Sequence, residues 1–374
     1  MATPIRVLIV DDSAVVRGSL GRIVDAAGDM RVVTTAVNGQ AALDALRHTP
    51  ADVVLLDIEM PVMDGLTALP LMLERQPGLR VLMTSSLTHE GAKVTMRALA
   101  LGAVDFVHKP QAKDGVQALT ALAAQLTGKI RAVAGGRGAT SGTTASPAAG
   151  TATATAAARS NVSGYAGPPG GAGPGGARGE WAPPQVVAIA SSTGGPNALA
   201  EIMRDLPGDF PVPILVTQHM PPIFTAMLAQ RLSREGALAC DEARDGEPLL
   251  AGHVYVAPGD YHMLVSGTAA APTIRLVQGE PENHCRPAAD PMFRSVAQVY
   301  GAATLAVVLT GMGDDGRRGC DVMVGAGGRV LVQDEASSVV WGMPGSVVEA
   351  NVPCSIVPLS AMAGQLVSAC CVRT

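Results

Sequence analysis

Hydrophobic positions in the first 130 residues alternate between short β-branched runs and longer segments with helical spacing. In residues 90–101, for example, Val94, Ala98 and Leu101 fall on one face of a helix. Five strand–helix units of this kind predict a parallel five-stranded sheet with helices on both faces, a doubly wound α/β domain. The predicted strands are residues 7–10, 32–36, 53–56, 81–83 and 106–107.

The same alternation returns after residue 185 and continues to the end of the chain. It predicts a second α/β domain, mostly parallel and Rossmann-like, in which a few shorter strands pair antiparallel. The predicted strands are residues 186–190, 213–217, 254–257, 305–309 and 329–333, and the predicted helices are residues 198–205, 224–234, 291–299 and 317–325.

A low-complexity segment separates the two patterns. From about residue 132 to residue 184 the chain consists almost entirely of Gly, Ala, Thr, Ser and Pro, and Glu180 is its single acid. Such a composition buries too little apolar surface to offset the entropy of ordering, so it predicts a disordered linker. A low-complexity interaction tract is the alternative. The expected domains are residues 1–130 and 185–374, joined by residues 131–184.

Composition narrows the class of protein. The net charge of −5 argues against nucleic acid or an anionic membrane as the main partner, because both require a basic surface. No apolar run approaches the roughly 20 residues that span a bilayer. The six cysteines lack CxxC spacing, which favours reduced structural thiols over zinc or disulfides. We therefore expect a cytoplasmic protein without membrane insertion.

Three carboxylates gather at one edge of the N-terminal sheet. Asp11 and Asp12 follow the first strand and Asp57 follows the third, and the carboxyl ends of parallel strands border one crevice. Hard oxygen ligands of this kind suit Mg²⁺. Ser85 and Lys109 end the fourth and fifth strands at the same edge. The set predicts phosphoryl transfer to Asp57; acids that merely cap helices are the alternative.

Residues 1–130 resemble a response-regulator receiver domain. The resemblance implies that Asp57 is the phosphoacceptor and that Asp11, Asp12, Asp57 and the backbone carbonyl of Glu59 hold Mg²⁺. It also implies a switch formed by Ser85, Phe106 and Lys109, with a cis bond between Lys109 and Pro110. The motifs that carry it are residues 10–13 (VDDS), 56–65 (LDIEMPVMDG), 84–86 (TSS) and 109–110 (KP).

The first strand of the second domain runs into a turn that suits a nucleophile. Two serines, two glycines and a proline follow the apolar run 186–190, and the proline opens a helix whose N–H groups face the same point. A serine nucleophile needs a base, and His219 follows directly after a predicted strand. His262 and His284 are the competing candidates.

A carboxylate that orients the base is expected in the glycine-rich loop of residues 310–316, which also follows a strand. Asp314 and Asp315 are adjacent there, and spacing alone does not choose between them. Glycine-rich turns of this kind also bind phosphates or nucleotides, which is the alternative interpretation.

Residues 185–374 resemble the catalytic domain of the chemotaxis protein-glutamate methylesterase family, whose members also deamidate glutamines. The resemblance implies Ser192 as nucleophile, rather than Ser191, His219 as base and Asp315 as orienter, with Thr193 and the Met312 backbone N–H supporting the oxyanion. The matching segments are residues 190–196 (ASSTGGP), 217–222 (TQHMPP), 255–260 (YVAPGD), 284–287 (HCRP), 309–313 (LTGMG), 333–338 (QDEASS) and 341–344 (WGMP).

The two resemblances together imply a phosphorylation-activated hydrolase. It would demethylate glutamate γ-methyl esters on methyl-accepting chemotaxis receptors, receive phosphate from a chemotaxis histidine kinase, act as a monomer and need no cofactor for ester cleavage. Two departures from the family pattern are Ile223, where glycine is common, and the long linker. The alternatives are a non-catalytic scaffold that binds receptor or nucleotide, and a transcription regulator, for which no basic recognition helix follows the linker.

Overall fold

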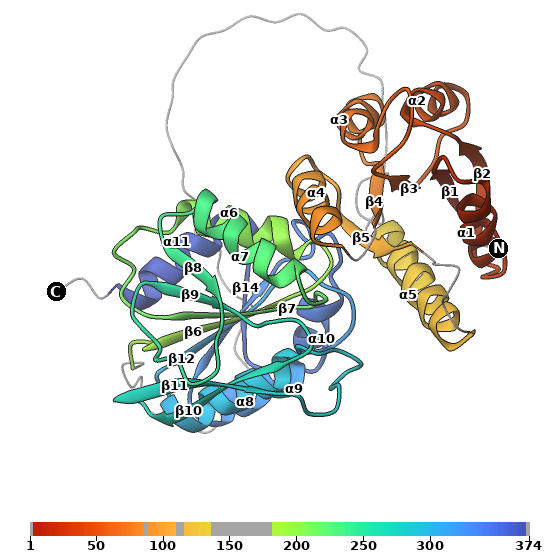
Figure 1. Cartoon of the computed structure of the whole chain (residues 1–374). Coiled ribbons are helices and arrows are strands. Elements are labelled where there is room, and N and C mark those ends of the chain that lie inside the picture. The colour runs from red at the N-terminus through yellow and green to blue at the C-terminus, as the bar shows by residue number, and fades with distance from the viewer. Residues whose placement is uncertain (1–2, 86–87, 110–115, 136–181, 372–374) are drawn as a thin grey trace, which may run out of the picture.

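The computed structural model describes residues 3–85, 88–109, 116–135 and 182–371. Most of the predicted linker, and the expected cis bond at Pro110, lie outside these residues. Figure 1 shows two α/β units, called here the N-terminal domain (residues 3–135) and the C-terminal domain (residues 182–371). The last helix of the N-terminal domain ends at Gly135, beyond the predicted boundary at residue 130.

The N-terminal domain contains the predicted five-stranded parallel sheet, and its strands lie in the order β2-β1-β3-β4-β5. Side chains of Ser13, Asn38, Asp64 and Thr88 cap the first four helices, which fixes where each helix starts. The elements are β1 (Ile5–Val10), α1 (Ala14–Asp25), β2 (Met30–Ala36), α2 (Gly39–His48), β3 (Val53–Asp57), α3 (Gly65–Arg75), β4 (Arg80–Ser85), α4 (His89–Ala100), β5 (Asp105–His108) and α5 (Val116–Gly135).

The described part of the C-terminal domain contains a seven-stranded parallel sheet in the order β14-β13-β12-β6-β7-β9-β8. The elements are β6 (Val186–Ser191), α6 (Gly195–Asp205), β7 (Ile214–Gln218), α7 (Phe224–Glu235), β8 (Ala239–Glu242), β9 (His253–Val256), β10 (His262–Thr268), β11 (Ala271–Val277), α8 (Ala289–Tyr300), β12 (Thr304–Val308), α9 (Arg317–Gly325), β13 (Arg329–Gln333), α10 (Gly342–Glu349), β14 (Ser355–Val357) and α11 (Leu359–Cys370).

The central strands of this sheet are buried on both faces, because helices cover both sides of it. Helices α6, α7 and α11 pack on one face, and α8, α9 and α10 on the other (Figure 1). Strands β10 and β11 form an antiparallel hairpin, which packs against α8. The sequence predicted that a few shorter strands pair antiparallel, but it did not locate these two. The hydrophobic pattern also missed the edge strands β8 and β14, because partly exposed strands lack a continuous apolar run.

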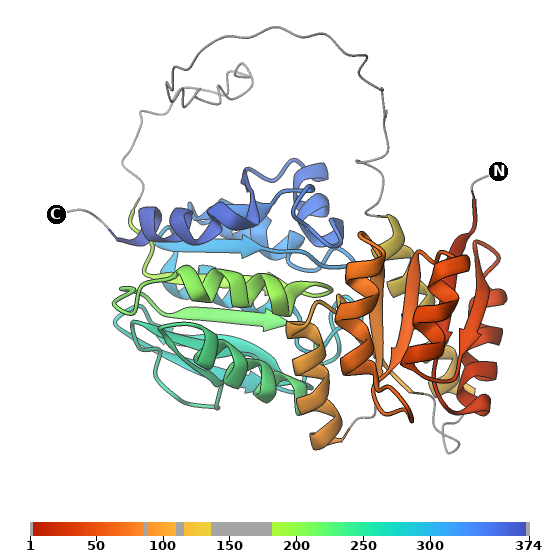
Figure 2. The same ribbon diagram turned by 90° about the horizontal axis from the view of Figure 1, so that it is seen from above.

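The two domains meet along α4 and β5 of the N-terminal domain, as the view in Figure 2 shows. Helix α4 contacts α6 and α7. The rings of Phe106 on β5 and Phe224 on α7 stack with centroids 4.3 Å apart. Buried side chains of both domains therefore form one continuous hydrophobic cluster across the contact. Among the described residues, no helix has the length and apolar content needed to cross a bilayer.

Candidate active site

Strand order brings the three predicted catalytic residues to one place. Strand β6 lies between β7 and β12, so the segments that follow these three strands share one end of the sheet. Ser192 follows β6, His219 follows β7, and the loop containing Asp315 follows β12. The strand connections also diverge to either side of β6, and crevices at such points are where open α/β sheets bind ligands.

His219 and Asp315 form a direct pair. The imidazole Nε2 lies 2.7 Å from Asp315 Oδ2, and both side chains are largely buried. The neighbouring Asp314 is half exposed and lies near Arg317 instead, at 3.6 Å. The competing candidate His262 lies elsewhere, since its Nε2 bonds the Glu280 carbonyl and its Nδ1 accepts the Ala288 N–H. The structure therefore places Asp315, and not Asp314, against the histidine at position 219.

Hydrogen-bond donors surround the Asp315 carboxylate. Its oxygens accept backbone N–H groups from Ala289 and Asp290, at the N-terminus of α8, at 2.6 and 3.1 Å. The Asn283 amide adds a further bond at 2.7 Å and also donates to Asp290. Although burial raises the pKa of Asp315, these bonds and the contact with His219 lower it overall. The carboxylate is thus held charged and oriented.

The loop before α8 supplies two contacts that the sequence did not single out. Asn283 binds Asp315, and Cys285 places its Sγ 3.5 Å from the Nδ1 of His219. Burial alone would lower the pKa of His219, but the hydrogen bonds to Asp315 and Cys285 raise it to about 10. Asn283 and Cys285 flank His284 in the chain. In the sequence, only the resemblance of residues 284–287 (HCRP) to the methylesterase family pointed to this segment.

The two serines have different surroundings. Ser191 ends β6, and its hydroxyl donates to Gln218 Oε1 at 2.7 Å. The same Gln218 amide donates to the Ser192 carbonyl at 3.0 Å, which fixes the turn. Any Cβ at Gly195 would overlap Gln218, so glycine is required there. Within the described chain, no hydrogen bond joins the Ser192 hydroxyl to His219; the two residues lie one step beyond the paired Ser191 and Gln218.

Two backbone N–H groups near Ser192 remain available. Those of Thr193 and Met312 have no hydrogen-bond partner among the residues that the structure describes. Thr193 is buried, whereas the Met312 side chain is 38% exposed. Free N–H groups at this point are suited to bind a developing negative charge on oxygen.

The N-terminal crevice contains the predicted acidic cluster. One carboxylate oxygen each from Asp11, Asp12 and Asp57 lies within 4.8 Å of the others. Lys109 Nζ lies 2.6 Å from Asp57 Oδ2 and 3.1 Å from Asp11 Oδ2. Burial raises the pKa of Asp57, and Lys109 opposes that rise only in part. Three acids facing one cation leave negative charge that a divalent cation would neutralise, so the donor set fits Mg²⁺.

The structure separates the three predicted switch residues, since Ser85 and Lys109 line the crevice and Phe106 does not. A cavity of about 130 Å³ beside Asp57 is lined by Glu59, Ser85 and Lys109 among others, which leaves room for a phosphoryl group. The Ser85 hydroxyl accepts a bond from Thr95 at 2.7 Å. Phe106 is not among the residues that line this cavity; its ring stacks on Phe224 of the C-terminal domain. Ser85 and Lys109 thus lie at the acidic crevice, and Phe106 lies at the domain contact.

Comparison with known families agrees with both sites. Residues 7–121 match the family model for the response regulator receiver domain, and residues 187–366 match the model for CheB methylesterase. A protein-glutamate methylesterase/protein-glutamine glutaminase of Rhodospirillum centenum is 45% identical over 95% of this chain and 91% of its own length. The chain belongs to this methylesterase family.

Other family members show a similar extent of likeness. A relative from Paramagnetospirillum magneticum with the same descriptive name is 46% identical over 96% of this chain and 94% of its own length. Among solved structures, the CheB methylesterase catalytic domain of Thermotoga maritima is 40% identical, with a TM-score of 0.49, and covers 50% of this chain and 98% of that domain.

In this methylesterase family member, the N-terminal domain sits directly on the serine turn. The Asp105 carboxylate on β5 accepts a hydrogen bond from the Thr193 hydroxyl at 2.7 Å. The Val104 carbonyl accepts the Gly194 N–H at 3.2 Å, and the Ala103 carbonyl accepts the Asn197 amide at 3.3 Å. Thr193 is buried in this contact, so the N-terminal domain lies against the turn that contains Ser192.

Ile223, the expected departure from the family pattern, has a φ of +75°, in a region where a β-branched side chain is strained and glycine is not. The next residue, Phe224, begins α7 and carries the ring that stacks on Phe106. The strained residue therefore lies directly beside the domain contact.

We expect Asn283→Ala to lower kcat about tenfold, because Asp315 loses a buried charge-assisted hydrogen bond. Asn283→Asp is a matched variant that keeps the size and tolerates the positive φ. The kcat of Asn283→Asp should be lower than that of Asn283→Ala, because the aspartate adds a third carboxylate beside Asp290 and Asp315. Initial rates at saturating substrate measure both effects. If Asn283→Asp and the wild type had equal rates, Asn283 would not position Asp315.

Proposed function

We propose that this chain is a phosphorylation-controlled hydrolase that cleaves glutamate γ-methyl esters, and deamidates glutamines, on methyl-accepting chemotaxis receptors. The relatives that match nearly the whole chain are named protein-glutamate methylesterase/protein-glutamine glutaminase. The observation that carries the proposal is the buried His219–Asp315 pair at the strand end next to Ser192. In chemotaxis such an activity resets receptor signalling during adaptation.

Ester cleavage follows from the roles of the three side chains. Ser192 Oγ attacks the ester carbonyl carbon while His219 accepts the serine proton, and the Thr193 and Met312 N–H groups bind the oxyanion. The tetrahedral intermediate collapses, and the proton held by His219 leaves with the methoxide as methanol. Water, deprotonated by His219, then attacks the acyl-enzyme and releases the glutamate and Ser192. With a glutamine substrate, ammonia leaves instead of methanol.

His219 needs a free Nδ1 for this role, since Asp315 occupies Nε2. In the covered arrangement Nδ1 faces Cys285, so Ser192 must replace the thiol as the partner of this nitrogen when the site opens. Nucleophile–base bonds are often long or absent before substrate binds. Asp315 then stabilises the imidazolium that forms during attack.

The N-terminal domain would control access through Asp57. Asp11, Asp12, Asp57 and the Glu59 carbonyl would hold Mg²⁺, which neutralises phosphoryl oxygens when it is bound. Asp57 attacks the phosphorus of a donor, the donor's own bond to phosphorus breaks, and imidazole from phosphohistidine or acetate from acetyl phosphate leaves. The phosphoryl group stays on Asp57, and Lys109 pairs with its oxygens. Movement of Phe106 toward Ser85 would then break its stack on Phe224 and weaken the hold on the serine turn. The expected phosphodonor is a chemotaxis histidine kinase, and the expected substrate is a methyl-accepting chemotaxis receptor. The hydrolase itself is expected to act as a monomer.

Methanol release from a methylated receptor, with and without acetyl phosphate and Mg²⁺, tests the proposal. We expect slow release from the unphosphorylated chain and faster release with the phosphodonor. Asp57→Asn should keep the slow rate and lose the stimulation. A non-catalytic scaffold would release no methanol under either condition and would not react at Ser192 with an organophosphate probe.

The basal rate should rise with pH between about 7 and 9. The pKa of His219 lies near 10 instead of 6.5, so the imidazole is protonated at neutral pH and becomes a base only as the pH increases. Asp315→Asn removes the carboxylate that raises this pKa, so its rise should move to lower pH while the maximum rate falls. Initial rates from pH 6 to 10 measure both. A profile that is flat from pH 7 to 9 would contradict the assignment.

The same shift affects folding stability. A folded-state pKa above the ordinary value stabilises the fold fully below pH 6.5, and this stabilisation is lost as the pH approaches 10. The free energy of unfolding should therefore decline over that range in the wild type. The decline should be smaller in His219→Gln, measured by urea unfolding at each pH.

A further inference from the structure

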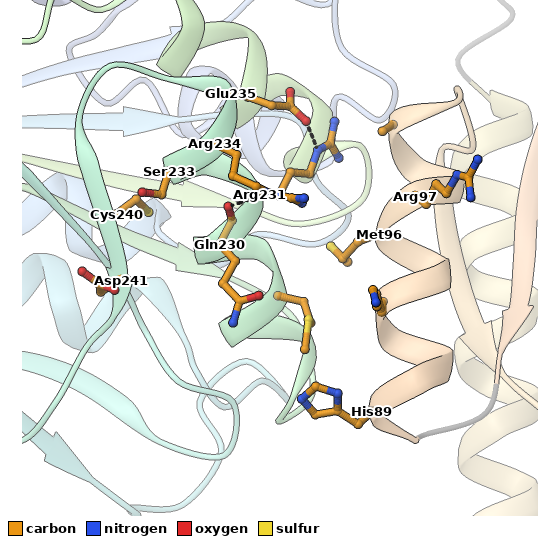
Figure 3. A pocket seen from close by; sticks show the side chains of 13 residues that line it. His89, Met96, Arg97, Gln230, Arg231, Ser233, Arg234, Glu235, Cys240 and Asp241 are labelled. Carbon is orange, nitrogen blue, oxygen red and sulfur yellow. Dashed lines mark hydrogen bonds and ion pairs between the residues drawn. The ribbon is translucent and has the colours of Figure 1, made fainter.

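We propose that the cavity between α4 and α7 binds a small organic anion of nucleotide-like chemistry, an aromatic ring that carries phosphate groups. The cavity has a volume of about 710 Å³ and is lined by both domains. This volume is typical of sites for small organic ligands. Figure 3 shows Met96 on α4 facing Gln230 on α7 across it, and Arg97 one residue further along α4 also belongs to the lining.

The charges that line the cavity are mostly positive. Lys93 and Arg97 project from α4, and Arg231 and Arg234 from α7. In the described ranges, neither Lys93 nor Arg97 has an ion-pair partner. Of the two acids in the lining, Glu235 pairs with Arg231 and Arg204, and Asp241 is largely exposed and lies 3.4 Å from His253. The cavity thus favours a ligand that brings negative charge.

Arg231 provides an independent indication of a missing acceptor. It is only 5% exposed, its Nε donates to Glu235 at 2.7 Å, and its Nη2 donates to Asn197 at 3.0 Å. Its Nη1 is buried and has no hydrogen-bond partner in the described structure. Buried guanidinium donors without an acceptor are unfavourable, and a phosphate oxygen is a strong acceptor for them.

The remaining lining distinguishes an organic anion from an inorganic one. Met96, Ala100, Met227 and Cys240 contribute apolar or sulfur surface. Methionine sulfur packs favourably against aromatic rings, and arginine stacks on them. Inorganic phosphate would fill only a small part of 710 Å³ and would leave this surface uncovered. A ring with phosphate groups satisfies both the cations and the apolar lining.

Binding of such a ligand would favour the docked arrangement of the two domains. Its effect on hydrolysis rests on the proposed function. The ligand contacts α4 and α7 together, so it binds only when the domains are docked and stabilises that state by mass action. Arg231 is also joined through Asn197 to the Ala103 carbonyl of the N-terminal domain. Binding should therefore lower basal hydrolysis, and phosphorylation of Asp57 should weaken binding.

Calorimetric titration of the full, unphosphorylated chain tests the site without relying on turnover. The probes are ADP and pyrophosphate, in buffer with EDTA at constant ionic strength. We expect saturable 1:1 binding of ADP, with pyrophosphate at least about tenfold weaker because it lacks the ring. Lys93→Gln/Arg97→Gln should weaken ADP binding about tenfold, whereas Arg47→Gln on α2, outside the cavity, should not change it.

Three results would overturn the proposal: no saturable ADP binding, equal affinity for ADP and pyrophosphate, or unchanged ADP binding in the double variant. Thermal unfolding confirms that the double variant is folded, and both of its positions lie on the surface of α4 away from the acidic crevice. Because calorimetry does not measure ester cleavage, loss of the proposed enzymatic function would leave this outcome unaffected.

Discussion

Replacement of Ser192 by alanine should lower methanol release from a methylated receptor by at least about 1,000-fold, while Asp57 is still phosphorylated. Loss of the nucleophile leaves only oxyanion binding and substrate orientation, which supply a small part of the rate in serine hydrolases. His219→Gln should be similarly inactive, because no other group at this strand end accepts the serine proton. Methanol release and acetyl phosphate-dependent labelling, measured on the same preparations, separate the two sites.

Ser191→Ala is the matched control for this experiment. The Ser191 hydroxyl already donates to Gln218 and lies at the end of β6, so its removal should cost only a few-fold in rate. Comparable inactivation of both serine variants would mean that the turn geometry, and not a particular hydroxyl, determines activity. Normal turnover in Ser192→Ala would exclude the proposed mechanism.

Asp105→Asn should raise the basal rate of the unphosphorylated chain about tenfold. The Asp105 carboxylate holds the Thr193 hydroxyl at 2.7 Å, and Lys129 holds the carboxylate at 2.7 Å. A neutral amide keeps the shape but weakens the charge-assisted bond, and 1.4 kcal/mol of lost contact energy shifts the docked population about tenfold. Methanol release without a phosphodonor measures the change.

The phosphorylated protein provides the control, because phosphorylation should already have broken the contact between Asp105 and Thr193. Wild type and Asp105→Asn should therefore release methanol at similar rates in acetyl phosphate. Deletion through Gly135, the end of α5, should raise the basal rate at least as much as the point variant. If the deletion left the rate unchanged at saturating substrate, access control by the N-terminal domain would be wrong. A response to deletion but not to Asp105→Asn would assign the contact to other residues.

Local patterns were sufficient for most of the fold. The alternation of short apolar runs with helical segments located ten strands and the parallel sheets, because side-chain periodicity is a property of neighbouring residues. Strands β8, β10, β11 and β14 escaped detection, since they are partly exposed and lack such a run. The motifs around Asp57 and Ser192 identified the family that the comparisons confirm.

The choice between adjacent candidates depended on tertiary structure. Asp314 and Asp315 are equivalent by spacing, but only Asp315 points back to His219 and to the N-terminus of α8. Asn283 was not predicted because its partner is 32 residues away in the chain, and nothing in its own neighbourhood encodes that contact.

The sequence by itself therefore determined most of the secondary structure, the two α/β domains and the residue types available for hydrolysis and phosphoryl transfer. Only the tertiary structure decided how these parts meet: β6 lies between β7 and β12, Cys285 faces the base, and Asp105 of one domain holds Thr193 of the other. The physical reason is that periodicity reports burial along a strand or helix, whereas strand order and domain contacts arise from packing between distant segments.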